Sequence, residues 1–138
     1  MNIPFNILSA ADPKSKCMDM VQANLKRKVP THWFSTLDMQ RMRLQCTRHP
    51  YATTCDACPV SPDIGICGTP CHPFSRQRQG RFLQSSVEDH GEFDVSMSQF
   101  FSWMERFEPR AQVCEQVLGF DQPFHCGSSE TPLQRFLA

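Results

Sequence analysis

The sequence has no net charge, no long apolar run and no positively charged start. Its 138 residues carry 14 basic and 14 acidic side chains, whereas domains that bind nucleic acid unaided usually have a basic excess. No apolar segment approaches the roughly 20 residues of a membrane-spanning helix, so no such helix is expected. Residues 1–11 are mildly apolar but lack the positive charge that opens a secretory signal peptide. We therefore expect an intracellular protein with no membrane partner.

Cysteine, by contrast, is abundant. The eight cysteines are Cys17, Cys46, Cys55, Cys58, Cys67, Cys71, Cys114 and Cys126. Without a secretion signal we expect them to be mainly reduced, some of them as buried small apolar side chains and one as a reactive thiolate. Hydrophobic residues make up 40% of the chain and charged residues 20%, which is typical of a globular domain.

Predicted strands and helices alternate along the chain. Strands are expected at 5–10, 32–37, 63–67 and 110–118, and helices at 14–25, 40–48, 97–107 and 132–137. Apolar side chains recur at spacings of three and four in helix 97–107, which predicts core packing. The polar stretch 77–91 is expected to be a mobile loop. This alternation indicates an α/β fold with a parallel sheet and right-handed crossovers.

Four chemically capable side chains lie at or just after the ends of the predicted strands. They are Asp12, Asp38, Cys71 and Glu115. Parallel α/β sheets bind their ligands beyond the carboxyl ends of the strands. The sequence therefore predicts that these four residues lie along one edge of the sheet.

Two segments carry a resemblance to a known family. Residues 68–75, Gly-Thr-Pro-Cys-His-Pro-Phe-Ser, resemble the Pro-Cys-Gln-Pro-Phe-Ser loop of the cytosine-C5 DNA methyltransferases. Residues 115–119, Glu-Gln-Val-Leu-Gly, resemble the later Glu-Asn-Val-x-Gly segment of that family. Weaker matches at 9–14 and 34–38 resemble the strands that meet the ribose and the adenine of the cofactor. The resemblance covers nearly the whole chain in the family's order.

The resemblance implies a fold, and it also shows which motifs of the family have no match in this sequence. It implies that residues 1–138 form a single partial C5-methyltransferase catalytic domain, with a Rossmann-like S-adenosylmethionine-dependent fold whose parallel sheet lacks its first strand. The family's Asp-x-Phe-x-Gly-x-Gly cofactor loop, its Gln-x-Arg-x-Arg segment and its target recognition region have no match here. Such a sheet would have an unpaired edge. We therefore expect marginal stability alone, and a second chain that supplies the missing parts as a partner.

The resemblance also assigns roles. It implies methyl transfer from S-adenosylmethionine to cytosine C5 in DNA, which places the protein in the nucleus if its source is eukaryotic; some relatives act on transfer RNA instead. A thiolate that adds to C6 makes C5 nucleophilic, and a carboxyl group near N3 can donate a proton. The implied residues are Cys71 and Glu115 for catalysis, Asp12, Asp38 and Pro70 for the cofactor, and Ser75, Gln116 and Val117 for the substrate. No metal ligand is implied.

Local alternatives remain for the acidic residues. Asp12 and Asp38 are equally interpreted as helix caps or first-turn acids. A second register of the ribose-binding segment puts Ala10 in the place of Asp12. Glu115 is alternatively a solvated carboxylate. Gln116 stands where the family has Asn, and His72 where Gln is common.

Three other functions are compatible with the sequence. The first is a catalytically inactive fragment or regulatory paralogue that acts as an interaction protein. The second is a zinc-binding module built on Cys55-x2-Cys58, with Cys46, His49, Cys67 and His72 nearby, since paired ligands at this spacing are typical of zinc sites. The third is a thiol redox protein that uses the same Cys55 and Cys58 pair.

Overall fold

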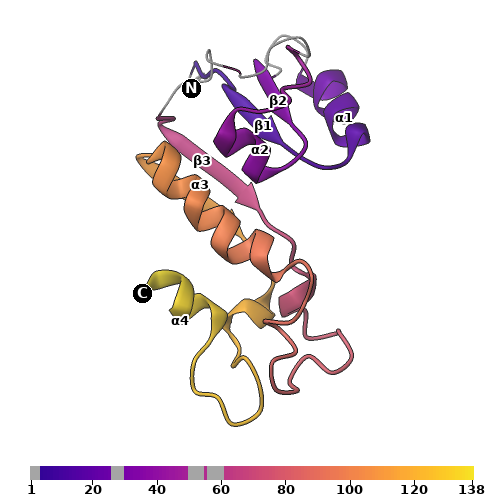
Figure 1. Ribbon diagram of the computed structural model, residues 1–138, viewed down its shortest axis with the longest axis vertical. Helices are drawn as coiled ribbons and strands as arrows, with labels where there is room; N and C mark the ends of the chain where they lie inside the picture. Colours follow the sequence, from indigo (N-terminus) through magenta and orange to yellow (C-terminus); the bar gives the residue numbers. More distant parts are fainter. Residues whose placement is uncertain (1–3, 26–29, 50–54, 56–60) are drawn as a thin grey trace. The chain divides into compact units, whose positions relative to one another are not determined.

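The described residues divide into two compact units. The computed structural model (Figure 1) describes residues 4–25, 30–49, 55 and 61–138. The first unit comprises Met1–Pro62 with Ser102–Pro109, and the second comprises Asp63–Phe101 with Arg110–Ala138. Among the described residues, none of the helices has the length and apolar character that crossing a membrane requires. Each unit is a mixed α/β structure, and each contains one parallel pair of strands.

The first unit is built on a strand–helix–strand segment. Its elements are β1 (Ser9–Ala11), α1 (Ser15–Leu25), β2 (His32–Phe34) and α2 (Leu37–Met42). The two strands pair in parallel with Ser9 opposite His32, and α2 packs against both of them (Figure 1). The predicted helix 14–25 is confirmed almost to the residue, while the first strand is shorter and later than the predicted 5–10.

A buried amide fixes α2 on the strands. Gln40 is 4% exposed, and its Nε2 donates to Ser9 Oγ of β1 at 2.6 Å. Its Oε1 accepts a hydrogen bond from Trp103 Nε1 at 3.0 Å. A buried polar group of this kind is tolerated because both of its ends are satisfied.

The prediction that Asp38 lies at the end of a strand is wrong. The strand stops at Phe34, and Asp38 lies in the first turn of α2. The cause is Thr36, whose side chain accepts a hydrogen bond from Met39 N at 3.1 Å and so caps the helix. The predicted strand 32–37 is therefore a three-residue strand followed by a capped helix that begins earlier than the predicted 40–48.

The second unit holds the other parallel pair. Its elements are β3 (Ile64–Gly68), the 3₁₀ turns η1 (His72–Phe74) and η3 (Leu118–Asp121), the π turn η2 (Val95–Gln99), the start of α3 (Phe100–Phe107), β4 (Ala111–Glu115) and α4 (Pro132–Leu137). Strand β3 pairs with β4 in parallel, from Ile64 opposite Ala111 to Gly68 opposite Glu115. The strand predicted at 110–118 ends early, at Glu115. The helix predicted at 132–137 is confirmed.

Aromatic side chains form the core of the second unit. Buried Phe74, Phe120 and Phe124 cluster there, together with Val87 and Met97. The rings of Phe74 and Phe120 meet edge to face with centroids 4.8 Å apart, a favoured geometry for aromatic pairs. The predicted core role of segment 97–107 is confirmed, because Met97, Phe100 and Phe107 are buried, although its first turn is π rather than α.

The loop 77–91 contributes a buried cation to this core, and its predicted mobility stays a prediction. Arg81 is 1% exposed. Its Nε donates to Phe74 O at 3.3 Å, its Nη2 to Gly119 O at 3.0 Å, and its Nη1 to Pro123 O and Phe124 O at 3.2 and 2.8 Å. Burial lowers the pKa of this guanidinium, with a smaller effect from Arg78. The Arg81 side chain thus donates to four backbone carbonyls, one in the segment after β3 and three in the segment after β4.

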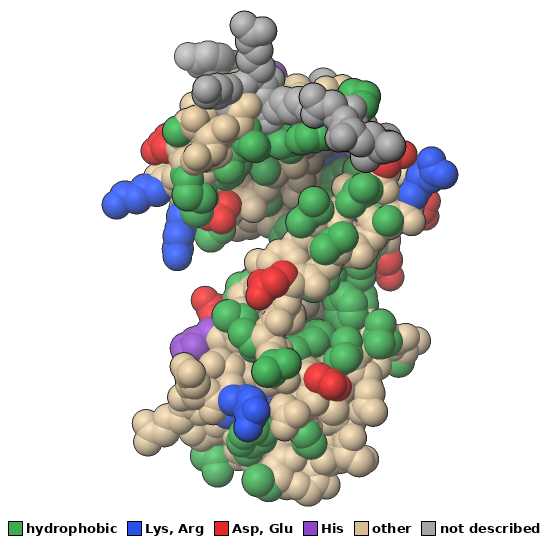
Figure 2. Space-filling model, turned by 180° about the vertical axis from the view of Figure 1, so that it is seen from behind, with side chains coloured by type: hydrophobic (Ala, Val, Ile, Leu, Met, Phe, Trp, Pro, Cys, Tyr) green, Lys and Arg blue, Asp and Glu red, His purple; other side chains and the backbone are tan. Residues whose placement is uncertain are grey.

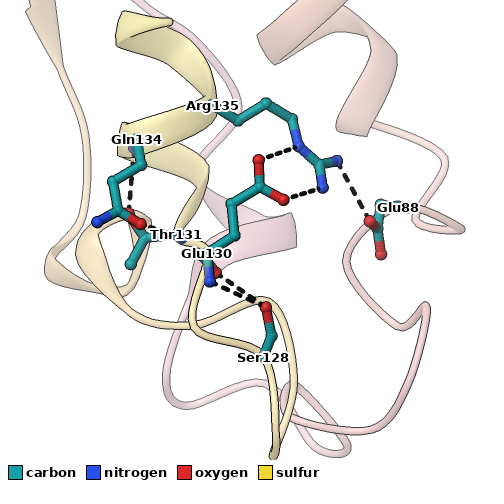
Figure 3. Close-up of polar contacts among 6 residues, drawn as sticks. All are labelled: Glu88, Ser128, Glu130, Thr131, Gln134 and Arg135. Carbon is teal, nitrogen blue, oxygen red and sulfur yellow. Dashed lines mark hydrogen bonds and ion pairs between the residues drawn. The ribbon is translucent and has the colours of Figure 1, made fainter.

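The last helix is fastened to the same loop. Thr131 and Gln134 form a capping box at the start of α4. Arg135 makes two hydrogen bonds to the Glu130 carboxylate, at 3.1 and 2.6 Å, and one to Glu88 at 3.2 Å (Figure 3). The guanidinium also lies 3.9 Å from the centroid of the Phe124 ring. These contacts join α4 to the 77–91 loop and to the aromatic core.

Replacement of Arg81 by Met should lower the free energy of unfolding by at least about 3 kcal/mol, because several buried carbonyls lose their donor at once. Arg110→Met is the matched control, since Arg110 is an exposed residue 3.6 Å from Asp63, and such pairs contribute up to about 1 kcal/mol. Urea unfolding should be followed by far-ultraviolet circular dichroism, because both tryptophans, Trp33 and Trp103, lie in the first unit. Equal losses in the two variants would contradict a special role for Arg81.

Candidate active site

Cys71 lies on a short loop whose other residues anchor it. Strand β3 ends at Gly68, and Cys71 precedes the 3₁₀ turn η1, where Phe74 N donates to Cys71 O at 3.1 Å. Pro73 and Phe74 are buried within η1, whereas Cys71 is exposed. The loop therefore has a fixed base and presents its thiol to solvent, as a nucleophile requires.

Glu115 ends the neighbouring strand at the same edge. It stands opposite Gly68 in the parallel register, and its Oε2 lies 3.4 Å from the position that a Cβ on Gly68 would occupy. Its side chain is exposed. The carboxylate thus lies over the glycine that leads into the Cys71 loop. The structure brings these two predicted catalytic segments to the carboxyl ends of adjacent parallel strands.

Gln116 joins the two segments that follow the strands. Its Nε2 donates to Thr69 Oγ1 at 2.8 Å and to Thr69 O at 3.2 Å. Thr69 is buried, and the Gln116 Oε1 accepts from Val117 N at 3.3 Å. The Gln116 side chain therefore links the two residues that directly follow the strands. Val117 packs against the aromatic core and precedes η3.

A glycine permits the closest approach between the two segments. A Cβ on Gly119 would lie 1.8 Å from Phe74 O and 2.9 Å from Phe74 C. No side chain fits there without moving backbone. The glycine of the second motif thus packs directly on the loop of the first, and Arg81 binds the carbonyls of both residues.

Pro70 and Ser75 make local contacts within the Cys71 loop. Pro70 O accepts from Ser96 Oγ at 2.8 Å, and Ser96 is buried in η2. Ser75 Oγ accepts from Gln77 N at 3.3 Å. Both residues therefore help to fix the loop, and their predicted roles toward cofactor and substrate stay predictions.

Two histidines next to Cys71 were not foreseen as a pair. His90 Nε2 lies 3.1 Å from His72 Nδ1, and His72 Nδ1 lies 3.9 Å from Glu92 Oε2. Desolvation lowers the pKa of His90, and Arg78 and His72 lower it further, against the opposing effect of Glu92. A neutral His90 is thereby favoured beside the loop. Sequence spacing alone, 18 residues of polar loop, gave no sign of this contact.

The two predicted cofactor carboxylates lie in the first unit. Asp12 follows β1, and its Oδ1 accepts from Lys14 N at 2.7 Å just before α1. Asp38 forms an ion pair with Arg41 at 3.2 Å within α2. Asp38 matches the alternative of a first-turn acid, whereas Asp12 lies before α1 and outside its first turn. Asp12 still follows a parallel strand, whereas Asp38 has lost the strand-end position on which its adenine role rested.

A second cluster of reactive side chains lies in the first unit. It comprises His32, Cys46, His49 and Cys55, whose ligand atoms all lie within 4.8 Å of one another. Three of these belong to the predicted zinc-binding set, while His32 was interpreted only as a strand residue. The predicted Cys58 lies outside the described residues. His72 is in the other unit, beside His90.

Cys67, the last member of the predicted zinc-binding set, is a strand residue instead. It lies in β3, opposite Cys114 of β4. Burial, and next the neighbouring Cys114, raise the pKa of the Cys67 thiol to about 12. This thiol therefore stays protonated near neutral pH and is a poor nucleophile.

Searches of family models, of curated proteins and of solved structures find no match to this chain. Its site must therefore be interpreted from its own residues and geometry.

Replacement of Gly119 by Ala should destabilise the second unit by about 1–3 kcal/mol, since the added methyl group meets the Phe74 carbonyl in a packed interior. Gly91→Ala is the matched control, because a Cβ there has nothing within 4 Å. Thermal unfolding monitored by circular dichroism gives the comparison. If Gly119→Ala unfolds at the same temperature as Gly91→Ala, the two motifs do not pack as described.

Proposed function

We propose that the chain is part of a cytosine-C5 methyltransferase that uses Cys71 as its nucleophile. One observation carries the proposal: Cys71 follows β3, Glu115 ends the adjacent parallel strand β4, and contacts of Gln116, Gly119 and Arg81 join the segments after the two strands. Ligands of parallel α/β sheets bind at this edge. The two residue types are those that thiolate addition to a pyrimidine requires.

The proposed reaction assigns a role to two residues of this chain, Cys71 and Glu115. The Cys71 thiolate forms a bond to C6 of a cytosine that has left the duplex stack. Glu115 donates a proton or hydrogen bond at N3 as negative charge builds on the ring. The base then holds an electron-rich C5 that can take up an electrophile. Once C5 carries the new substituent, loss of the C5 proton to a base, departure of the Cys71 thiolate from C6 and return of the N3 proton to Glu115 would restore the aromatic ring.

The cofactor implied by the resemblance is S-adenosylmethionine, which supplies an electrophilic methyl group. Asp12 fits the role of the ribose-binding carboxylate, because it directly follows a parallel strand and precedes a helix. Asp38 does not fit the adenine-binding role, because it lies within α2 and is paired with Arg41. Binding of the cofactor would therefore depend on Asp12 and on residues other than Asp38.

We further propose that the chain forms part of a larger Rossmann-like domain. Parallel sheets are normally buried on both faces, yet Ile64, Ile66 and Val113, on one face of the β3–β4 pair, are 59%, 82% and 56% exposed. Hydrophobic side chains also reach the surface in the view of Figure 2. A second chain that covers this face is the partner we propose, and DNA is the proposed substrate.

Exchange of the cytosine C5 proton tests the first step without cofactor. Addition of Cys71 to C6 lets C5 take a deuteron from solvent, and elimination then releases the original proton. We expect deuterium to enter cytosines of a single-stranded oligonucleotide with the full chain, to be lost with Cys71→Ser, and to fall by roughly 10²-fold or more with Glu115→Gln, as for other acid–base groups. Cys126→Ser, which replaces another exposed thiol, should leave the exchange unchanged.

Mass spectrometry of the recovered nucleosides measures this exchange. Exchange no faster than with Cys71→Ser would contradict the proposal and favour a catalytically inactive interaction protein. Where exchange occurs, 5-fluorocytosine DNA with S-adenosylmethionine tests the complete reaction, because fluorine at C5 prevents elimination. A covalent adduct on Cys71 would then show that this chain suffices for methyl transfer. Exchange without an adduct would indicate that a second chain supplies the cofactor site.

A further inference from the structure

We propose that His32, Cys46, His49 and Cys55 bind one zinc ion that holds the first unit together. The four ligand atoms, two imidazole nitrogens and two thiol sulfurs, lie within 4.8 Å of one another. Two thiolates and two imidazoles are a common ligand set of structural zinc. Every member belongs to the first unit, so the site is complete within it and does not depend on the proposed methyl transfer.

The distances between the ligand atoms agree with a tetrahedral centre. Bonds of about 2.3 Å to sulfur and about 2.0 Å to nitrogen place neighbouring ligand atoms roughly 3.5 Å apart. His49 Nδ1 lies 3.5 Å from both Cys46 Sγ and Cys55 Sγ. His32 Nδ1 lies 3.9 Å from Cys46 Sγ and 2.8 Å from Cys55 Sγ. Small side-chain adjustments suffice to place all four around one ion.

The backbone after α2 is shaped to bring these residues together. Arg43 and Gln45 have positive φ values of 59° and 53°, which are uncommon for residues other than glycine. The tight turn that results places Cys46, and His49 N then donates to Cys46 O at 3.1 Å. Cys55 N donates to Arg43 O at 2.8 Å, so the returning chain is fixed to the same turn.

Burial and charge both favour a structural ion. His32, Cys46 and Cys55 are 1%, 2% and 4% exposed, while His49 closes the site from the surface. Two thiolates neutralise the two charges of zinc, so the complex can be buried without net charge. Four protein ligands leave no open position for water or substrate, which is typical of a structural site rather than a catalytic one.

The small hydrophobic cluster of the first unit is a further argument for a structural metal ion. Its described hydrophobic cluster consists of Phe34 with Cys46 and Cys55 themselves, and partly buried Ala11 and Met39 pack against it. Its two strands have three residues each. Small domains with so little core are usually held by disulfides or metal ions. Zinc would therefore add to the small apolar cluster that the described residues of this unit form.

Cobalt titration of the reduced, metal-stripped full chain tests the proposal. We expect one equivalent to bind with the intense visible absorption of a tetrahedral site and with thiolate-to-cobalt charge-transfer bands, and zinc to displace it. His49→Ala and Cys46→Ser should each weaken binding by at least about tenfold. His49 is exposed, so its replacement need not disturb the fold. The emission of Trp33 and Trp103, both in the first unit, should shift when a chelator removes the metal.

Three control variants separate this site from other candidates. Cys58→Ser should keep the cobalt spectrum, although the sequence pairs Cys58 with Cys55. Cys17→Ser, at another partly buried thiol of the first unit, should also keep it. His90→Ala removes one member of the exposed group His72, His90 and Glu92 and should have no effect. Failure of the unaltered chain to bind metal, or loss of the spectrum in any control, would overturn the proposed ligand set.

Discussion

The arrangement of the second unit depends on the buried guanidinium of Arg81. Its donors satisfy carbonyls of Phe74, Gly119, Pro123 and Phe124, which belong to the segments after β3 and β4. A guanidinium has a fixed fork of donors, so it determines how these segments lie as well as how strongly they are held. Cys71 lies in the first of these segments, and Glu115 directly precedes the second. A buried cation therefore fixes the relative placement of the thiol loop and the strand that ends in the carboxylate.

The two units differ in what stabilises them besides their small hydrophobic clusters. The second has a cluster of aromatic rings and uses Arg81 to satisfy the carbonyls around it. The first has very short strands and few buried apolar side chains, and we propose that zinc joins its segments. In the second unit a polar side chain that satisfies several partners supports a small hydrophobic core, and the proposed zinc ion would do the same in the first unit. The exposed apolar face of the β3–β4 pair fits the proposal that a further layer belongs on it.

The sequence predicted those features that local patterns control. Helix 14–25 was predicted from its apolar spacing and strand β3 from its apolar run before Gly68, while the helix predicted at 132–137 begins at a proline, Pro132. The predicted end of β2 was wrong, because Thr36 caps a helix where the apolar pattern had indicated that the strand continues. Arg81 and His32 were missed because their roles depend on residues far along the chain: Arg81 binds carbonyls 38–43 residues later, and no spacing within a loop indicates such contacts.

The central claim is that the Cys71 loop and the segment after Glu115 form one cooperative structure. Native-state hydrogen exchange tests it directly, through the amides of Phe74, Phe120, Phe124 and Cys126, which donate to Cys71 O, Val117 O, Glu130 O and Phe82 O. Amides of one cooperative unit open together. We expect these four to share one opening free energy and one dependence on denaturant. Separate opening of Phe74 from the other three would contradict the account, because the thiol loop would then move independently of the segment that follows the carboxylate.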